Sequence, residues 1–231
     1  DQLFGGPRRQ PETPVEQRHM DVASSVQVVT EEIMLRLARH AREVTGQRNL
    51  CIAGAVALNC VANGKILREK IFDHIWIQPA AGDAGGSLGA ALAVWHMNKD
   101  HPQPRSITQP DAMQGSFLGP AFSDEEIEAV LKSHNAIYRK LDPSALLDEV
   151  VTVLGREEIV GWFQGRMEFG PRALGHRSIL GDPRSPKMQS ILNLKVKFRE
   201  SFRPFAPAVL LEHAPELFEL EGDSPYMLIV A

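Results

Sequence analysis

The hydrophobic positions in the first hundred residues switch repeatedly between helical and strand-like spacing. Apolar side chains recur every three or four positions over residues 22–44, and Gly46 follows them. This spacing predicts an amphipathic helix that Asp21 caps and Gly46 ends. Short apolar runs at residues 50–53 and 74–78 are typical of strands, and each precedes a predicted helix.

This alternation places the first part of the chain in the α/β class, with parallel strands and helices packed on them. Ligands of such sheets bind beyond the carboxyl ends of the strands, where turns at residues 54–59 and 82–86 follow here. Their small residues let backbone N–H groups approach a phosphate at a helix N-terminus. Asp83 can cap its helix or hold a cation, and Asn59 can be simply a polar helix residue. Neither turn has a Walker or dinucleotide-binding sequence.

The pattern changes after a polar, proline-rich stretch at residues 99–114, where we place the domain boundary. Residues 123–126 form a capping-box sequence that opens a helix, and a second helix is predicted over residues 143–155. Strands are predicted over residues 136–141 and 158–164.

A basic stretch, residues 165–207, follows the last of these strands. Between Gly165 and Pro204 it carries nine Lys and Arg against three Asp and Glu, although the whole chain has a net charge of −4. A solvated basic surface would explain this excess. However, aromatic residues and rigid Gly-Pro and Arg-Pro steps separate the charges, which favours cations held by a framework around an anion. His176 is a candidate acid or base, but a lone His beside Arg177 is more often structural.

A last helix is predicted inside the basic stretch. Ser185 would cap it and Pro186 would be its first residue. Ser190, Asn193 and Lys197 would then share one exposed face.

The composition narrows the class of protein. The length of 231 residues suits one large domain or two small ones, and the net charge of −4 argues against general nucleic-acid binding. No apolar run approaches the roughly 20 residues that span a bilayer, and no signal peptide is recognised. Cys51 and Cys60 are expected to be buried thiols in a reducing cytoplasm. Because the chain starts at Asp1 and stops within an apolar run, we interpret it as the middle of a longer protein.

Three long motifs make one family resemblance specific: GRMEFGPRALGHRSILGDPR, NLKVKFRESFRPFAP and QPAAGDAGGSLGAAL. They closely resemble motifs of the NodU/CmcH family of O-carbamoyltransferases, and DVASSVQ and the turn at residues 54–59 fit the same family. The resemblance implies a partial actin/Hsp70-like (ASKHA) lobe over residues 1–105. A linker would occupy residues 106–114, and the N-terminal part of a YrdC-like α/β domain would occupy residues 115–231.

The family resemblance also implies an activity. Such enzymes move a carbamoyl group from carbamoyl phosphate, by way of carbamoyl adenylate, to a hydroxyl group of a small molecule such as a sugar, an antibiotic or a Nod-factor-like acceptor. ATP with Mg²⁺ would be required, and iron would occupy the full-length first domain. The protein would act in the cytoplasm, away from nucleic acid and membranes, and its assembly could be a homodimer.

Particular residues correspond to the family's functional positions. The resemblance implies that carbamoyl phosphate and the ATP phosphates are bound by Arg172, Lys197 and Arg203. Arg166 and Arg199 are further cofactor-binding candidates. The resemblance also assigns the nucleotide-binding turn to Gly54 and Asn59, and a metal ligand to Asp83.

Two departures from the family pattern affect these expectations. Ala55 stands where the family usually has Gly, and its methyl group would weaken close approach of the backbone to a nucleotide. The family's two metal-binding histidines have no counterpart in this sequence, so we expect the chain alone to be inactive. The alternatives are a YrdC-type carbamoyl or threonylcarbamoyl adenylate former and a non-catalytic nucleotide-binding module.

Overall fold

The computed structural model describes residues 3–98, 111–220 and 222–231. The chain divides into two compact units, unit 1 (residues 1–106 and 208–231) and unit 2 (residues 107–207). Both contain helices and short strands, so the expected α/β class is confirmed. The predicted second domain, residues 115–231, differs in extent from unit 2 because residues 208–231 group with unit 1. The assignment of these stretches to ASKHA-like and YrdC-like domains stays a prediction.

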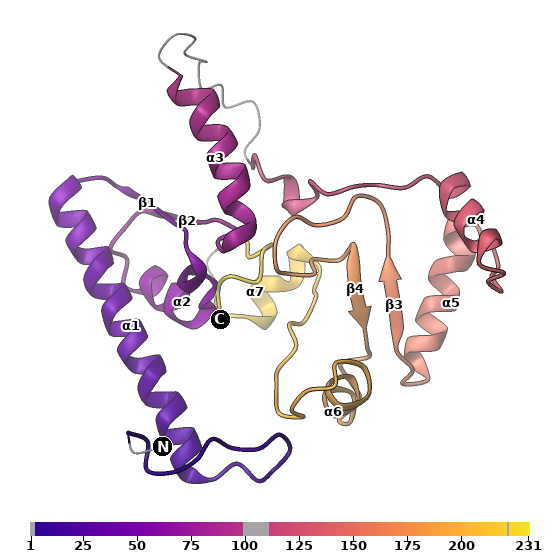
Figure 1. Cartoon of the computed structure of the whole chain (residues 1–231), viewed down its shortest axis with the longest axis horizontal. Coiled ribbons are helices and arrows are strands. Elements are labelled where there is room, and N and C mark those ends of the chain that lie inside the picture. Colours follow the sequence, from indigo (N-terminus) through magenta and orange to yellow (C-terminus); the bar gives the residue numbers. More distant parts are fainter. Residues whose placement is uncertain (1–2, 99–110, 221) are drawn as a thin grey trace. The chain divides into compact units, whose positions relative to one another are not determined.

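Unit 1 is organised around the long helix α1 (Gln17–Thr45), which packs on α2 (Cys60–Arg68) and on the strands β1 (Asn49–Ile52) and β2 (His74–Ile77) (Figure 1). The two strands pair in parallel, as predicted, with Leu50 opposite Ile75. The buried core of this unit consists of Met34, Leu35, Ala38, Ala62, Ile66 and Phe72.

The two ends of α1 show what local sequence can and cannot predict. Gly46 ends the helix as expected, with a left-handed φ of 63° and its N–H donating to the Arg42 carbonyl at 2.9 Å. The predicted start at Asp21 is wrong, because Glu16 is the N-cap. The backbone N–H of Glu16 donates to Nδ1 of His19 at 3.0 Å, so His takes the place that Glu or Gln has in the usual capping box.

The remaining elements of unit 1 lie between β1 and α2, after β2 and near the end of the chain. They are the 3₁₀ turns Ala55–Leu58 and Leu211–His213 and the helices α3 (Asp83–Met97) and α7 (Ala214–Leu217). Residues 226–230 reach α2 and β2: Asn63 Nδ2 donates to the Leu228 carbonyl at 2.9 Å, and Tyr226 meets Trp76 edge to face. These contacts explain why the end of the chain groups with unit 1.

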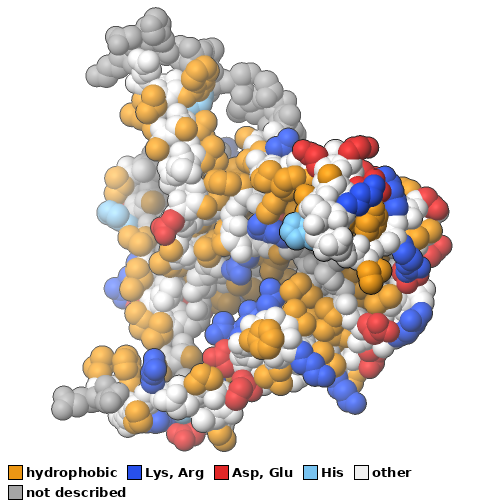
Figure 2. Space-filling model, turned by 45° about the vertical axis from the view of Figure 1, so that its right-hand side comes forward, with side chains coloured by type: hydrophobic (Ala, Val, Ile, Leu, Met, Phe, Trp, Pro, Cys, Tyr) orange, Lys and Arg blue, Asp and Glu red, His pale blue; other side chains and the backbone are white. Residues whose placement is uncertain are grey.

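The helix α3 presents apolar side chains to its surroundings. Leu92, Val94, Trp95 and Met97 are all exposed, and orange side chains run along this helix in Figure 2. Among the described residues, no helix is both long and apolar enough to cross a membrane. Cys51 is exposed and Cys60 half-buried, so the expected burial of Cys51 is wrong, and both are free thiols.

Unit 2 begins with two capped helices, α4 (Asp124–Ser133) and α5 (Pro143–Gly155). The predicted capping box is present: Glu126 N–H donates to Ser123 Oγ at 3.2 Å, and Ser123 N–H donates to Glu126 Oε2 at 2.7 Å. Pro143 occupies the first turn of α5, as predicted. The predicted strand at residues 136–141 is wrong, because this segment pairs with no strand in the described part of the chain and Ile137 is fully exposed.

A short antiparallel pair follows, β3 (Val160–Phe163) and β4 (Arg177–Leu180). The sequence pattern predicted β3 but not β4, whose apolar run is only Ile179 and Leu180. After β4 the chain forms α6 (Met188–Ile191), which continues into a π-helix (Leu192–Val196). Lys187 is the N-cap of α6, so the predicted cap at Ser185 is wrong.

Candidate functional site

Two turns of unit 1 lie side by side at the carboxyl ends of the parallel strands. The N–H of Gly54, two residues after β1, donates to the carbonyl of Ala81 at 2.9 Å, immediately before the second turn. Gly54 has a φ of 96°, which glycine adopts readily and other residues rarely do. A Cβ on Gly85 would lie 2.0 Å from the Ala80 carbonyl oxygen, so the second turn needs glycine for close packing. The parallel sheet therefore juxtaposes two turns of small residues.

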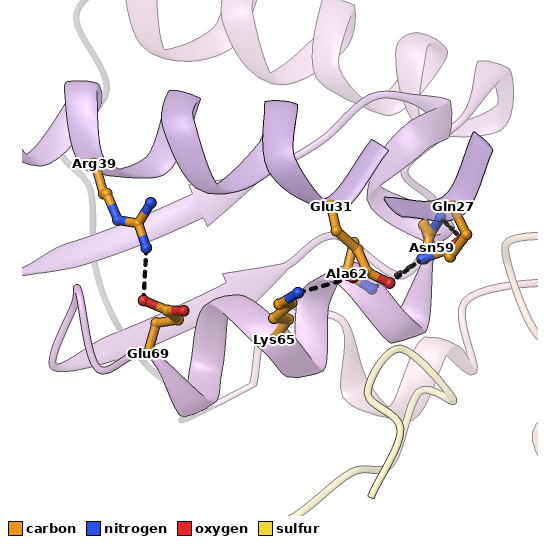
Figure 3. A network of polar contacts seen from close by, with 7 residues as sticks. All are labelled: Gln27, Glu31, Arg39, Asn59, Ala62, Lys65 and Glu69. Carbon is orange, nitrogen blue, oxygen red and sulfur yellow. Dashed lines mark hydrogen bonds and ion pairs between the residues drawn. The ribbon is translucent and has the colours of Figure 1, made fainter. Parts of the chain in front are cut away.

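Asn59 closes the first turn and starts α2. As the N-cap of α2, its Oδ1 accepts a hydrogen bond from the Ala62 N–H at 3.0 Å. Its amide also exchanges two hydrogen bonds with Gln27 of α1, Nδ2 to Gln27 Oε1 at 2.9 Å and Gln27 Nε2 to Oδ1 at 3.2 Å (Figure 3). Asn59 is therefore more than a polar helix residue, because its side chain ties the turn to α1.

Asp83 is the first residue of α3 and is exposed, and Gly82 is the N-cap. The Asp83 carboxylate lies in the first turn of α3, where a negative charge is favourable. Within the described ranges, no group of three or more His, Cys, Asp and Glu is arranged to hold a metal ion. The assignment of Asp83 as a metal ligand and the expected iron stay predictions.

In unit 2 the basic stretch begins with a loop that folds around a buried carboxylate. Glu168 is 4% exposed, and its Oε1 accepts hydrogen bonds from the backbone N–H groups of Leu174, His176 and Arg177 at 2.7, 2.9 and 3.2 Å. Burial raises the pKa of Glu168, but these donors outweigh it and the net pKa lies below its ordinary value of 4.5. The loop carrying Arg172 is thus closed on the Glu168 carboxylate.

Arg172 is half-buried on this loop, and Arg166 is exposed just before it. Arg166 Nη1 donates to the Gly119 carbonyl at 2.8 Å, which ties it to the segment before α4. The His176 ring stacks on Phe117 with centroids 3.7 Å apart, and Nδ1 lies 2.7 Å from the Arg166 carbonyl oxygen. Because a carbonyl only accepts, this Nδ1 carries the proton, and the contacts favour the structural interpretation of His176.

A second buried polar side chain, Asn193, organises the other end of the basic stretch. It is fully buried, and its Nδ2 donates to the carbonyls of Ser201 and Arg203 at 3.1 and 2.8 Å. Its Oδ1 accepts from Arg199 Nε at 2.7 Å, and the Arg199 guanidinium lies 5.0 Å from the centre of the Phe205 ring. The predicted exposure of Asn193 is wrong, because the π-helix changes the angular spacing that an α-helix would give.

The cations of the basic stretch differ in how far acidic groups already balance them. The Arg184 guanidinium donates hydrogen bonds to Asp182 through Nε and Nη2 and lowers the pKa of that carboxyl to about 2. Arg203 Nε donates to Glu200 Oε2 at 2.8 Å. Lys197 is exposed where the π-helix ends. Two of the three assigned catalytic cations lie near Asn193: its side chain binds the Arg203 carbonyl, and Lys197 follows the π-helix that contains it. The third, Arg172, lies on the separate loop held by Glu168.

A surface pocket of about 380 Å³ lies elsewhere, on unit 1. It is lined by Glu31, Val61, Lys65, Arg68 and Glu69. Lys65 Nζ pairs with Glu31 Oε2 at 3.0 Å, and Arg39 Nη2 pairs with Glu69 Oε2 at 2.7 Å. With two cations and two carboxylates in its lining, the pocket has no charge preference for an anion.

The sequence interpretation missed Gln27, Glu31 and Glu168 and misplaced Asn193. Glu168 had a signal, because an acid directly before a Gly-Pro turn in a strongly basic stretch needs an explanation. Asn193, between Leu192 and Leu194, also breaks an apolar run. Gln27 had no comparable signal, since its partner Asn59 lies on a different element.

Comparisons with known proteins cover most of the chain. The family described as carbamoyltransferase N-terminus matches residues 1–92, and the family described as carbamoyltransferase C-terminus matches residues 151–231. An uncharacterized protein of Synechocystis is 59% identical over 99% of this chain. Nodulation protein NolO of Bradyrhizobium diazoefficiens is 44% identical over 94% of the chain, and Nodulation protein U of Rhizobium tropici is 36% identical over 87%. The chain spans 37%, 39% and 32% of the lengths of these three relatives.

Proposed function

Because the chain belongs to the carbamoyltransferase family, whose members are transferases, we propose that the protein moves a carbamoyl group from carbamoyl phosphate to a hydroxyl group of a small molecule. Water would release phosphate from carbamoyl phosphate, the resulting carbamate would attack the α-phosphate of ATP–Mg²⁺ to give carbamoyl adenylate and pyrophosphate, and the acceptor hydroxyl would then displace AMP. The acceptor would be a sugar or another hydroxyl-bearing metabolite, by analogy with the nodulation proteins. The ASKHA-like and YrdC-like domains would divide these steps between them.

One observation carries this proposal: the basic stretch combines exposed cations with buried polar anchors. Lys197 and Arg203 are exposed, whereas Glu168 and Asn193 are buried and hydrogen-bonded to backbone groups of the loops that carry the cations. Cations fixed before the anion arrives bind it without the cost of ordering the loops. A merely solvated basic surface would not need such anchors.

Each assigned residue then has a defined role. The Arg172 and Arg203 guanidinium groups would hold phosphate oxygens through paired hydrogen bonds, and Lys197 would supply a point charge. Together they would stabilise the charge that develops on the phosphoryl groups during adenylate formation. Arg166 and Arg199 each hold a protein group through one nitrogen, Gly119 O and Asn193 Oδ1, as Arg203 holds Glu200, and their remaining N–H groups would add further contacts to the phosphates.

The experiment that tests this proposal measures pyrophosphate release from ATP by the whole protein, with and without carbamoyl phosphate. Adenylate formation releases pyrophosphate, so we expect release that depends on carbamoyl phosphate. Lys197→Ala and Arg172→Ala should reduce that release about 100-fold, since each removes charge stabilisation of the transition state. Calorimetric titration with carbamoyl phosphate and with ATP–Mg²⁺ should show weaker binding in both variants.

Lys132→Ala is a suitable control, because Lys132 is also exposed but pairs with Glu128 on α4, outside the basic stretch. It should release pyrophosphate at the wild-type rate. A wild-type protein that binds carbamoyl phosphate but releases no pyrophosphate would exclude the adenylate step. Equal loss in the Lys132 variant would show that general positive charge, and not the assigned residues, governs binding.

A further inference from the structure

The amide of Asn59 is held by a chain of polar contacts that crosses from α2 to α1 and back. Lys65 Nζ lies 3.0 Å from Glu31 Oε2, and Gln27 Nε2 donates to Glu31 Oε1 at 2.8 Å. Gln27 and Asn59 then exchange two hydrogen bonds, and Asn59 Oδ1 accepts from the Ala62 N–H. Figure 3 shows these side chains in sequence between the two helices.

In this network of side chains, the negative charge of Glu31 decides which group donates and which accepts in each hydrogen bond. A carboxylate only accepts, so Glu31 requires the N–H end of the Gln27 amide. The Oε1 end of Gln27 must then face Asn59, where it accepts from Nδ2. This leaves Asn59 Oδ1 directed at the first turn of α2, where it caps the helix. The Gln27 amide and then the Lys65 ammonium hold the pKa of Glu31 below its ordinary value, which keeps this acceptor ionised.

We infer that Gln27 is a positioning residue: held by Glu31, it fixes the amide orientation of Asn59 and with it the phosphate-facing turn at residues 54–59. The inference rests on the proposed function and on the nucleotide-binding turn that the family resemblance assigns to Gly54 and Asn59. Both lone pairs of Asn59 Oδ1 are engaged, by Ala62 N–H and by Gln27 Nε2. Asn59 therefore acts through the shape of the turn, in which the N–H groups of Gly54, Ala57 and Asn59 donate to carbonyls and those of Ala55 and Val56 would meet the phosphates.

The test uses Gln27→Glu, Glu31→Gln and the double exchange in the whole protein. Gln27→Glu loses the hydrogen bond to Glu31 and places a second carboxylate beside it, and the repulsion between the two turns the side chain at position 27 away from Asn59. We expect its Kd for ATP–Mg²⁺ to rise about tenfold, the usual effect of losing a hydrogen bond to a charged group. In the double variant, the carboxylate at position 27 accepts both from Asn59 Nδ2 and from the amide at position 31. The Asn59 orientation is thereby restored, and the Kd should return to within about threefold of wild type.

Gln17→Glu is the matched control. Gln17 also lies on α1 and donates to a carboxylate one turn later, Asp21 Oδ1 at 2.7 Å, but this pair is exposed. It should change neither the Kd nor the melting temperature. Single-variant loss, double-variant recovery and an unaffected control together support the inference. Unchanged affinity in Gln27→Glu, or no recovery in the double variant, overturns it.

A readout without ligand separates this inference from the proposed function. Amide hydrogen exchange of Ala62 should accelerate in Gln27→Glu and recover in the double variant, since Asn59 Oδ1 accepts that N–H. If the wild-type protein does not bind ATP–Mg²⁺, the nucleotide role of the turn fails, and the exchange of Ala62 still decides whether Gln27 positions Asn59. Unchanged exchange of Ala62 in Gln27→Glu overturns the inference whatever the protein binds.

Discussion

The two candidate regions reach a defined shape by different means. In unit 1, the turns after β1 and β2 are placed by a parallel strand pair, and glycines let the backbone pack closely. In unit 2, buried Glu168 holds the loop between β3 and β4, and buried Asn193 holds the loop after the π-helix. A region shaped by closely packed backbone is sensitive to added side-chain volume. A region held by buried polar side chains is sensitive to the loss of one polar group. The comparison therefore predicts which substitutions damage each region.

The largest effect is expected for Asn193→Ala in unit 2. It removes two donors to backbone carbonyls and the acceptor for Arg199, all at a fully buried position. We expect the free energy of unfolding to fall by about 3 kcal/mol, measured by urea denaturation. Gln189→Ala is the control, because exposed Gln189 Nε2 also donates to the Arg203 carbonyl, at 3.1 Å. If both variants lose the same stability, burial of the amide does not matter.

The next largest effect belongs to unit 1 and is steric. Gly85→Ala would place a methyl group 2.0 Å from the Ala80 carbonyl oxygen, which forces α3 or the turn to move. We expect a loss of about 2 kcal/mol in the free energy of unfolding. Gly82→Ala has open space and a φ of −84°, so it should be nearly neutral. Thermal denaturation of the two variants compares them directly, and an equal melting temperature would contradict the packing argument.

A smaller effect, which depends on pH, is expected for Glu168→Gln. Because the folded pKa of Glu168 is depressed, its stabilising effect is present above the unfolded-state value near 4.5. It is lost as the pH falls through the folded pKa, which lies lower. The variant should lose about 1.5 kcal/mol at pH 7 and show a shallower decline in stability below about pH 4.5. Urea midpoints from pH 7 to pH 3 give both quantities, and parallel curves would contradict the assignment.

The smallest effect on stability is expected for Lys197→Ala. Lys197 is exposed, so its truncation should change the free energy of unfolding by less than about 0.5 kcal/mol. Its carbamoyl phosphate affinity should nevertheless fall, in contrast to Asn193→Ala, where binding and stability fall together. Calorimetry and urea denaturation on the same sample make this comparison. A large loss of stability would place Lys197 in the framework.

Local sequence signals predicted the elements that local contacts determine. The capping box at Ser123, the proline at the start of α5 and the glycine after α1 were all readable, because cap and helix are neighbours in sequence. The segment at residues 136–141 had strand-like residues but no partner, and a strand depends on its partner. The start of α1 was misplaced because a His side chain takes over the capping-box role.

The polar anchors of the candidate sites could not be predicted in the same way. The Gln27 and Asn59 side chains meet across two helices, and the three donors to Glu168 are all backbone groups. Apolar periodicity carries no information on such contacts. Asn193 was assigned to the wrong side because its expected direction assumed α-helical geometry, whereas it lies in a π-helix.

The π-helix has a consequence for how this segment tolerates change in length. Its Lys197 N–H donates to the carbonyl of Leu192, five positions earlier, at 2.9 Å, where an α-helix would use the fourth. The hydrogen bond of this segment thus spans one residue more than that of an α-helix. Deleting exposed Leu194 would let an α-helix form in which the Lys197 N–H still donates to the Leu192 carbonyl, then four positions earlier. Lys197 and Arg199 would keep their directions, so this deletion would leave those charges in place, whereas the same deletion in an α-helix would rotate every later side chain by about 100°.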